Sequence, residues 1–447
     1  MSPIATNHHE TRSERLKVLA IGLAAAWLLA GCSVAAASPS STRAQPSPSA
    51  SSSAIATTPP NPTPTPLPSV GAAPAGDWAG IRWISAGPVF PQTPTAGTNK
   101  GSLVTVSVYG WSRGYVGFRT AIEQGSSPSV TMVSTFSADG LHWTAGQPME
   151  VAGLESWVDI TQVVEGPSGL LAVGRYPGAA CGGPATINAL WTSTDGLTWS
   201  LVQPSADFAS ASVYWVDGGS TGFIASGIEK DGKAQAVWLS ADGRSWTVVP
   251  LTSPTFGKFV LDGASNFAGG YVISGAILKD AECGQTWVTP SLWWSADGRS
   301  WTRSQLPGAE NANDAWITTT KVSDHALMAV ANEWDEATRV NSQQVWVSND
   351  GRTWKLVASP SNFLGDGIMT DGQRGLVLIE PGAGTDAPPT VATIGDDLTV
   401  KTLSQTGDVP IYSAALTPRW LTALGPTGVV ILSSEGLDLW LGVPTAS

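Results

Sequence analysis

The chain has 447 residues, of which 13% are charged and 42% hydrophobic, and its formal net charge is −12. An acidic surface without basic clusters argues against nucleic acid and other polyanions as partners, and it favours solubility. No zinc-type Cys/His set, Gly-rich phosphate loop or Ser-His-Asp order stands out, so the sequence predicts no metal and no cofactor.

The first 31 residues have the pattern of an export signal. A basic segment ending at Lys17 precedes a short apolar stretch, residues 18–28, which is too short to cross a bilayer comfortably. The stretch leads into Leu29-Ala30-Gly31-Cys32, which resembles the lipobox of bacterial lipoproteins. The resemblance implies cleavage before Cys32, diacylation of Cys32 and anchoring on the extracytoplasmic face of a bacterial cell membrane. An ordinary signal peptide or a membrane helix is the alternative.

Residues 32–76 are rich in Ser, Pro, Thr and Ala and contain almost no large apolar side chains. Such a composition cannot bury a core, so we expect an extended, disordered tether. Roughly 370 residues remain, 77–447, which is enough for one large repetitive domain.

Within this domain a seven-residue motif, Ser-x-Asp-Gly-x-x-Trp, occurs five times after apolar, β-prone runs. Asp-Gly between two strands predicts a hairpin, in which the carboxylate accepts backbone N–H bonds and Gly supplies a positive φ. The Trp then lies on the next strand, where it can point between neighbouring sheets. The copies contribute Asp139 and Trp143, Asp195 and Trp199, Asp242 and Trp246, Asp297 and Trp301, and Asp350 and Trp354. Five equivalent copies favour a structural role over a catalytic one.

The motif resembles the Asp-box, or BNR repeat, of the sialidase-like β-propellers. A period of about 50 residues with one hairpin signature per period is also what stacked four-stranded sheets leave in a sequence. Both observations predict an all-β fold, a β-propeller of four-stranded blades whose strands we call A to D from the inside outward.

We count seven blades, with six as the alternative. Five contain the motif, a degenerate sixth covers residues 375–403, and a seventh begins near Trp420 and stops after strand C. The strand predicted at residues 81–85 belongs to none of these blades, and its sequence resembles that of a D strand. We therefore expect this N-terminal strand to complete the last blade, which closes the ring and removes two open edges.

Two cysteines remain after Cys32. Cys181 and Cys283 fall in the long B–C loops of blades 2 and 4, which flank a short loop in blade 3. Outside the membrane the two can form a disulfide, and two free thiols are the alternative.

Tryptophans and polar residues recur near the A strands and on one B–C loop. An exposed Trp beside carboxylates can stack on a sugar and bind its hydroxyls, so we expect a carbohydrate- or peptide-binding rim on the loop face opposite the motif turns. Packing between blades is the other interpretation of the same residues. The predicted ligand-binding residues are Trp157, Asp159, Trp215, Asp217, Asp314, Trp316 and Trp334.

The sialidase resemblance also implies three arginines and a Tyr–Glu pair, and these do not carry over. The nearest string to the first arginine motif is Phe118-Arg119-Thr120-Ala121, which lacks Ile-Pro and falls on a B strand. We therefore assign no catalytic residue. The sequence favours a non-catalytic, surface-tethered recognition or scaffold module. An extracytoplasmic glycoside hydrolase with a divergent site is the alternative.

Overall fold

The computed structural model describes residues 78–86, 89–90, 103–123, 129–151, 158–175, 187–203, 205–230, 234–252, 254–280, 286–309, 316–323, 326–335, 340–357, 368–371, 376–379, 388–394, 400–411, 421–432 and 438–445. The chain divides into two units, and every described residue belongs to the unit formed by Ser69–Ala179 and Gly183–Ser447. Within these ranges, no helix is both long and apolar enough to cross a membrane.

The described strands form seven sheets, which we number in chain order. Sheet 1 contains β2 (Leu103–Trp111), β3 (Gly114–Glu123), β4 (Ser129–Ser137) and β5 (Thr144–Pro148). Sheet 2 contains β6 (Asp159–Gly166), β7 (Gly169–Arg175), β8 (Ile187–Ser193) and β9 (Ser200–Leu201). Sheet 3 contains β10 (Ser212–Gly219), β11 (Gly222–Ile228), β12 (Gln235–Ser240) and β13 (Thr247–Pro250).

The next three sheets repeat this order. Sheet 4 contains β14 (Phe259–Phe267), β15 (Gly270–Asp280), β16 (Thr286–Ser295) and β17 (Thr302–Arg303). Sheet 5 contains β18 (Trp316–Ser323), β19 (Ala326–Asp335), β20 (Val340–Ser348) and β21 (Lys355–Val357). Sheet 6 contains β22 (Ile368–Asp371), β23 (Leu376–Ile379), β24 (Thr390–Ile394) and β25 (Val400–Thr402).

Sheet 7 joins the two ends of the domain. Its strand order is β26 (Ser404–Gly407), β1 (Gly80–Ala86), β29 (Leu439–Thr445), β28 (Gly428–Leu432) and β27 (Leu421–Gly425). The strand β1 pairs antiparallel with β29 along its whole length, from Gly80 opposite Thr445 to Ala86 opposite Leu439. The prediction that the N-terminal strand completes the last blade is confirmed.

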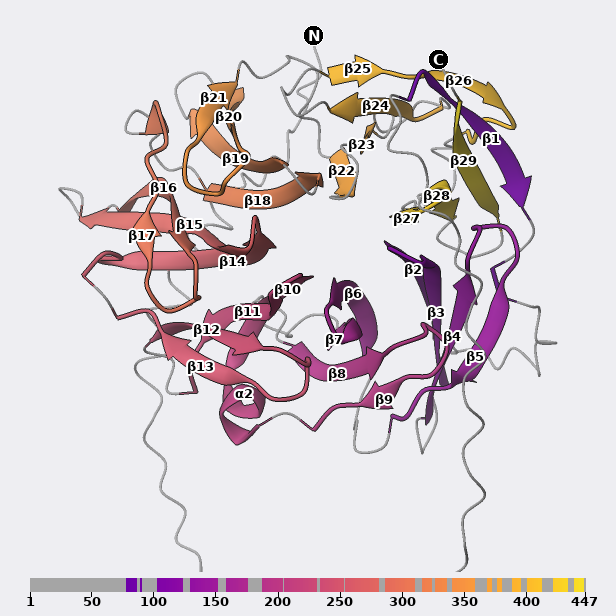
Figure 1. Ribbon diagram of the computed structural model, residues 1–447, viewed down its shortest axis with the longest axis horizontal. Coiled ribbons are helices and arrows are strands. Elements are labelled where there is room, and N and C mark those ends of the chain that lie inside the picture. The colour runs from indigo at the N-terminus through magenta and orange to yellow at the C-terminus, as the bar shows by residue number, and fades with distance from the viewer. Residues whose placement is uncertain are drawn as a thin grey trace, which may run out of the picture. The chain divides into compact units, whose positions relative to one another are not determined.

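The innermost strand of each sheet contacts the innermost strand of the next. The contacts run in the order β2, β6, β10, β14, β18, β22, β27 and back to β2. Figure 1 shows the sheets following one another around a common centre in this order. The all-β propeller predicted from the repeats is confirmed, and the described strands supply seven sheets to the ring.

A fifth strand on the last sheet was not predicted. The strand β26, which follows β25 of sheet 6 in the chain, pairs in parallel with β1, from Gly80 opposite Ser404 to Trp83 opposite Gly407. The indole Nε1 of Trp83 also donates a hydrogen bond to Gln405 Oε1 at 2.8 Å. Consequently β1 is held on both edges, by β29 on one side and by β26 on the other.

The hydrophobic core lies between neighbouring sheets. One cluster joins Leu171 and Leu190 of sheet 2 to Phe223 and Trp238 of sheet 3. The short helix α2 (Ala206–Ser210), which the sequence interpretation did not include, lies between these sheets in the chain and buries Phe208 against Trp238 and Trp246. Each sheet therefore depends on its neighbours for burial, as in other repeat folds.

Candidate functional site

The five motif turns share one set of hydrogen bonds. In the first, Asp139 Oδ1 accepts the backbone N–H groups of Leu141 and His142, both at 2.8 Å. Ser137 Oγ donates to Asp139 Oδ1 at 3.1 Å and accepts the Gly140 N–H at 2.8 Å. The glycine has φ +79°, a conformation that favours glycine. The same Asp-to-backbone bonds recur at Asp195, Asp242, Asp297 and Asp350.

These bonds hold the motif carboxylates in the ionised form. Backbone N–H groups of Ser300 and Arg299 lower the pKa of Asp297 to about 2. Burial alone would raise the pKa of Asp139, but bonds from His142 and Leu141 outweigh it and lower the pKa to about 2. The pKa values of Asp195, Asp242 and Asp350 are lowered in the same way, against the opposing effect of burial. A carboxylate with so low a pKa is a poor proton donor, which supports a structural role.

The motif tryptophans join sheets. Trp199 of sheet 2 packs edge-on against Phe118 of sheet 1, with ring centroids 5.1 Å apart. The side chains of Trp143, Trp199, Trp246 and Trp354 also donate to the carbonyl of their own motif glycine. Arg352 of the fifth motif lies over the Trp294 ring of sheet 4 at 3.5 Å from its centroid. Its guanidinium therefore serves packing between sheets.

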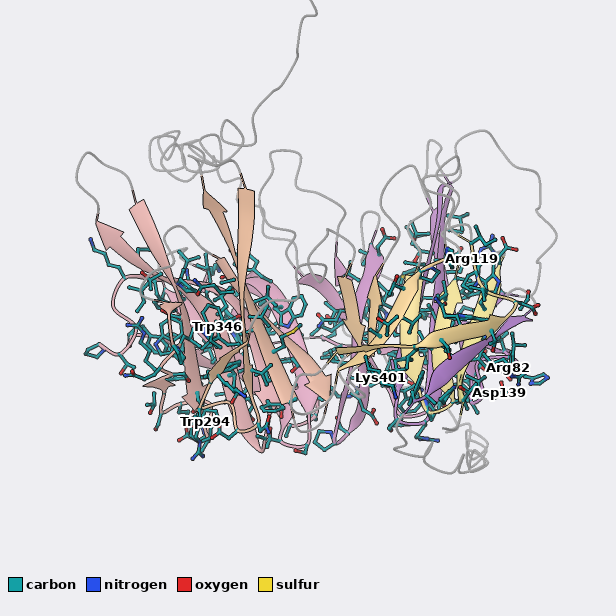
Figure 2. All side chains as sticks on the ribbon, turned by 90° about the horizontal axis from the view of Figure 1, so that it is seen from above. Arg82, Arg119, Asp139, Trp294, Trp346 and Lys401 are labelled. Atoms are coloured by element: carbon teal, nitrogen blue, oxygen red, sulfur yellow. The ribbon has the colours of Figure 1, made fainter. Side chains whose placement is uncertain are left out.

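Arg119, the nearest match to a sialidase arginine, lies on the B strand β3, opposite Val106 and Val133. Figure 2 shows it higher in the view than Asp139, away from that motif turn.

A chain of polar contacts links the innermost strands. The Tyr109 hydroxyl donates to the Ile160 carbonyl at 2.8 Å, and Gln162 Nε2 donates to the Val216 carbonyl at 2.5 Å. Asp217 Oδ2 accepts the backbone N–H of Asn266 at 2.7 Å. Each contact crosses from one sheet to the next, so these side chains act as clamps between blades.

Two of the predicted binding aspartates belong to such contacts. Asp159 begins β6, and its Oδ1 accepts the Thr105 hydroxyl of sheet 1 at 2.6 Å. The structure places Asp217 two residues before the end of β10, toward the β10–β11 turn, rather than at the start of the strand. In both cases the carboxylate bonds a neighbouring sheet, which fits the packing interpretation better than the binding one.

Trp215 differs from these clamps because its side chain is 41% exposed. It directly follows a shift in strand register, between Val213 and Trp215 of β10. The same shift occurs in sheets 2 and 4, where the residue that follows it is Gln162 or Gly263. A tryptophan at this position is therefore not required by the repeat.

The structure describes other predicted residues only in part. Trp316 is the first residue of β18, opposite Asn332, and Trp334 lies in β19, opposite Asn341. The remaining predicted positions, Trp157, Asp314, Cys32, Cys181 and Cys283, lie outside the described residues.

Sequence reasoning missed Asp262, on the innermost strand β14. It is the residue skipped by the register shift between Leu261 and Gly263. Burial raises its pKa from 3.8 to about 7, although one hydrogen bond from the backbone N–H of Ile317 in sheet 5 opposes the shift. Its Oδ2 atom is buried without a hydrogen-bond partner. The only sequence signal was an acidic residue directly after the apolar run Phe259–Leu261.

Among the described residues no group of three or more His, Cys, Asp or Glu side chains could hold a metal ion. Asp159, Asp217 and Asp262 of the innermost strands each accept a hydrogen bond from a neighbouring sheet.

No protein-family model matches the chain, and a search of curated proteins finds no match. Among solved structures, the α-L-arabinanase of Penicillium chrysogenum complexed with arabinobiose is 13% identical, with a TM-score of 0.35 and coverage of 73% of this chain and 97% of that chain. The α-L-arabinofuranosidase arb93a of Fusarium graminearum is 13% identical, with a TM-score of 0.36 and coverage of 82% and 97%. The β-propeller domain of the Trilobed protease from Pyrococcus furiosus is 9% identical, with a TM-score of 0.41 and coverage of 75% and 93%. The similar structures thus include β-propeller glycoside hydrolases.

Proposed function

We propose that the chain is a surface lipoprotein whose propeller, built on Asp-box repeats of the sialidase-like kind, is a non-catalytic recognition or scaffold module. Cys32 would carry the lipid that anchors the protein to the extracytoplasmic face of the bacterial cell membrane, and residues 32–76 would form the tether. The ligand would be a glycan, cell-wall material or a protein, and not nucleic acid.

The observation that carries the proposal is the exposure of Trp215 on an innermost strand. Of the large hydrophobic side chains that are exposed among the described residues, it is the one aromatic, and the others are Val104, Leu356 and Ile411. A flat, exposed indole is the usual platform for a sugar face or an apolar peptide side chain. The repeat does not require it, since Gln162 and Gly263 occupy the matching positions.

The inner carboxylates support a binding module over a hydrolase. Glycoside hydrolysis of the common kind needs two carboxyl groups facing each other across the scissile bond. Asp159 and Asp217 each accept a hydrogen bond from an adjacent sheet, which supports a packing role for both.

The test is a ligand screen of the propeller, residues 77–447, on glycan arrays and on isolated cell-wall material. Trp215→Ala should abolish any binding found on the intact protein. Leu356→Ala is the matched control, because Leu356 is 43% exposed but lies on the outermost strand β21. Binding that survives Trp215→Ala unchanged would refute the proposed platform.

A glycoside hydrolase with a divergent site is the second candidate. Asp262, whose pKa burial raises to about 7, does not supply its proton donor, because the side chain is enclosed between neighbouring sheets where a substrate does not reach it. Fluorogenic sialosides and other glycosides, incubated with the same protein, test this candidate. Turnover of any of these substrates would replace the recognition proposal with the enzyme.

The anchor and the disulfide are tested separately. Wild-type protein should incorporate a palmitate analogue and fractionate with membranes, and Cys32→Ser should do neither.

Mass mapping without reductant should find Cys181 joined to Cys283, while two alkylated thiols would contradict that pairing.

A further inference from the structure

The facing surfaces of sheets 4 and 5 carry polar groups within an apolar seam. Val272 of β15 and Trp346 of β20 belong to the hydrophobic cluster between these two sheets. Because side chains alternate along a strand, Ser274 faces sheet 5 together with Val272, and Gln344 faces sheet 4 together with Trp346. Asp262 also faces sheet 5, since it accepts the backbone N–H of Ile317.

Three oxygens in this seam are buried without a hydrogen-bond partner. They are Asp262 Oδ2, Ser274 Oγ and Gln344 Oε1. Ser274 is only 1% exposed, so bulk solvent does not reach its hydroxyl. Buried polar atoms in native proteins almost always have hydrogen-bond partners. Three unpartnered oxygens on two facing surfaces therefore indicate one shared hydrogen-bond partner.

The strand register brings the three groups to one stretch of the seam. Gly263, which follows Asp262, pairs with Ser274, and a Cβ placed on this glycine would lie 3.2 Å from Ser274 Oγ. In the opposite sheet, Ile317 pairs with Ala331 and Ala331 pairs with Gln344, so these residues form one cross-strand row. The bond from Ile317 to Asp262 aligns this row with the Gly263–Ser274 pair.

Small side chains leave room between the polar groups. Gly263 and Ala331 lie at the two central positions, where a large residue would fill the space. A site that is polar, enclosed and bordered by small residues is where proteins hold internal water, which typically makes about three hydrogen bonds.

We propose that an ordered water molecule is bound between sheets 4 and 5 by Asp262, Ser274 and Gln344. When Asp262 is ionised, the water donates one proton to Asp262 Oδ2 and the other to Gln344 Oε1, and it accepts the Ser274 hydroxyl. When Asp262 is protonated, its Oδ2–H donates to the water, and the water donates to Gln344 Oε1 and Ser274 Oγ. Either arrangement satisfies all three orphan oxygens with the two donors and one acceptor site of a single water. It links the innermost strand of sheet 4 to the third strand of sheet 5, which no protein–protein hydrogen bond described above does.

Water fits this donor set better than an ion does. A hard cation usually takes six or more oxygen ligands, and the site offers three. An anion is excluded because two of the three groups are a carboxyl and an amide oxygen, which repel negative charge.

The direct test is a crystal structure of the full chain that resolves individual waters. Density within hydrogen-bonding distance of Asp262 Oδ2, Ser274 Oγ and Gln344 Oε1 is expected, and a dry seam overturns the proposal. This measurement uses the wild-type protein and needs no variant to fold.

A stability measurement distinguishes a Ser274 hydroxyl that binds the water from one that has no hydrogen-bond partner. If the water is present, Ser274→Ala removes a satisfied bond and should lower Tm by about 1–2 °C in a protein of this size. If the hydroxyl has no partner, the same change relieves a buried polar group and should raise Tm, which overturns the proposal. Ser226→Ala is the matched control, because Ser226 is equally buried and pairs with Trp215 at the matching position of sheet 3.

Salt titrations test whether a cation occupies the site in place of the water. The Tm of the wild type at constant ionic strength should not depend on whether the cation is sodium, potassium, magnesium or calcium. A rise with one cation that is lost in Asp262→Asn would assign the site to that ion and overturn the water.

Discussion

Asp262 makes the stability of the propeller depend on pH in the direction opposite to most carboxylates. Its pKa is about 7 in the folded chain against 3.8 for the free group. Between these values the folded state holds a proton that the unfolded state has released, so the free energy of unfolding falls as pH rises. A difference of about 3 in pKa corresponds to roughly 4 kcal/mol, which the protein has lost once the pH passes 7.

Asp262→Asn should remove this dependence. The amide keeps an acceptor for the Ile317 N–H and cannot ionise, so the variant should be more stable than the wild type at pH 8, by up to about 4 kcal/mol. Near pH 4 both proteins carry a neutral group there and should have similar stability. Denaturant unfolding from pH 4 to pH 8, followed by tryptophan fluorescence, measures the difference. A variant that is equally or less stable at pH 8 would refute the assignment of a raised pKa.

Three further predictions concern the architecture. Trp246→Ala should destabilise the fold by roughly 3–5 kcal/mol, because the indole packs on Phe208 between sheets 2 and 3. Leu356→Ala is the control: its side chain is exposed, so the change in the free energy of unfolding, measured by denaturant titration, should be less than about 0.5 kcal/mol. Deleting residues 78–86 should unfold the ring cooperatively, since it strips strand partners from both β29 and β26, and a truncated protein with unchanged melting would disprove this closure. Asp139→Asn should lower stability at neutral pH and much less at pH 2. The lowered pKa of Asp139 stabilises the fold fully above 3.8, and this stabilisation is lost as the pH falls through about 2, so an equal loss at both pH values would contradict the prediction.

The repeat made the fold predictable. Five copies of one hairpin indicated the period, the turn chemistry and the burial of four motif Trp side chains, while the fifth, Trp143, is only partly buried. The turn chemistry could be predicted because it is local to seven residues. The closing strand could be predicted since it resembled the D strands of other blades.

The parts that sequence reasoning missed depend on distant contacts. The strand β26 pairs with β1, which lies more than 300 residues earlier in the chain. Its sequence, Ser-Gln-Thr-Gly, lacks the alternation of apolar and polar residues that predicts a strand. Asp262 is followed by Gly263, so the pair reads like another Asp-Gly turn, yet it occupies a register shift inside a strand. Its raised pKa comes from burial against sheet 5, which no local pattern encodes.

The repeats also separate structural residues from candidate functional ones. A residue that the architecture needs recurs at the same place with the same bonds, as the motif aspartates do in five of the seven sheets. At the position after the register shift, the three sheets instead have Gln162, Trp215 and Gly263. Gln162 clamps the next sheet, and Gly263 borders the proposed water. Trp215 has an exposed ring there, and exposing an indole to solvent does not stabilise the fold. A ligand that covers this ring would account for it, so loss of binding without loss of stability is the decisive signature to seek in Trp215→Ala.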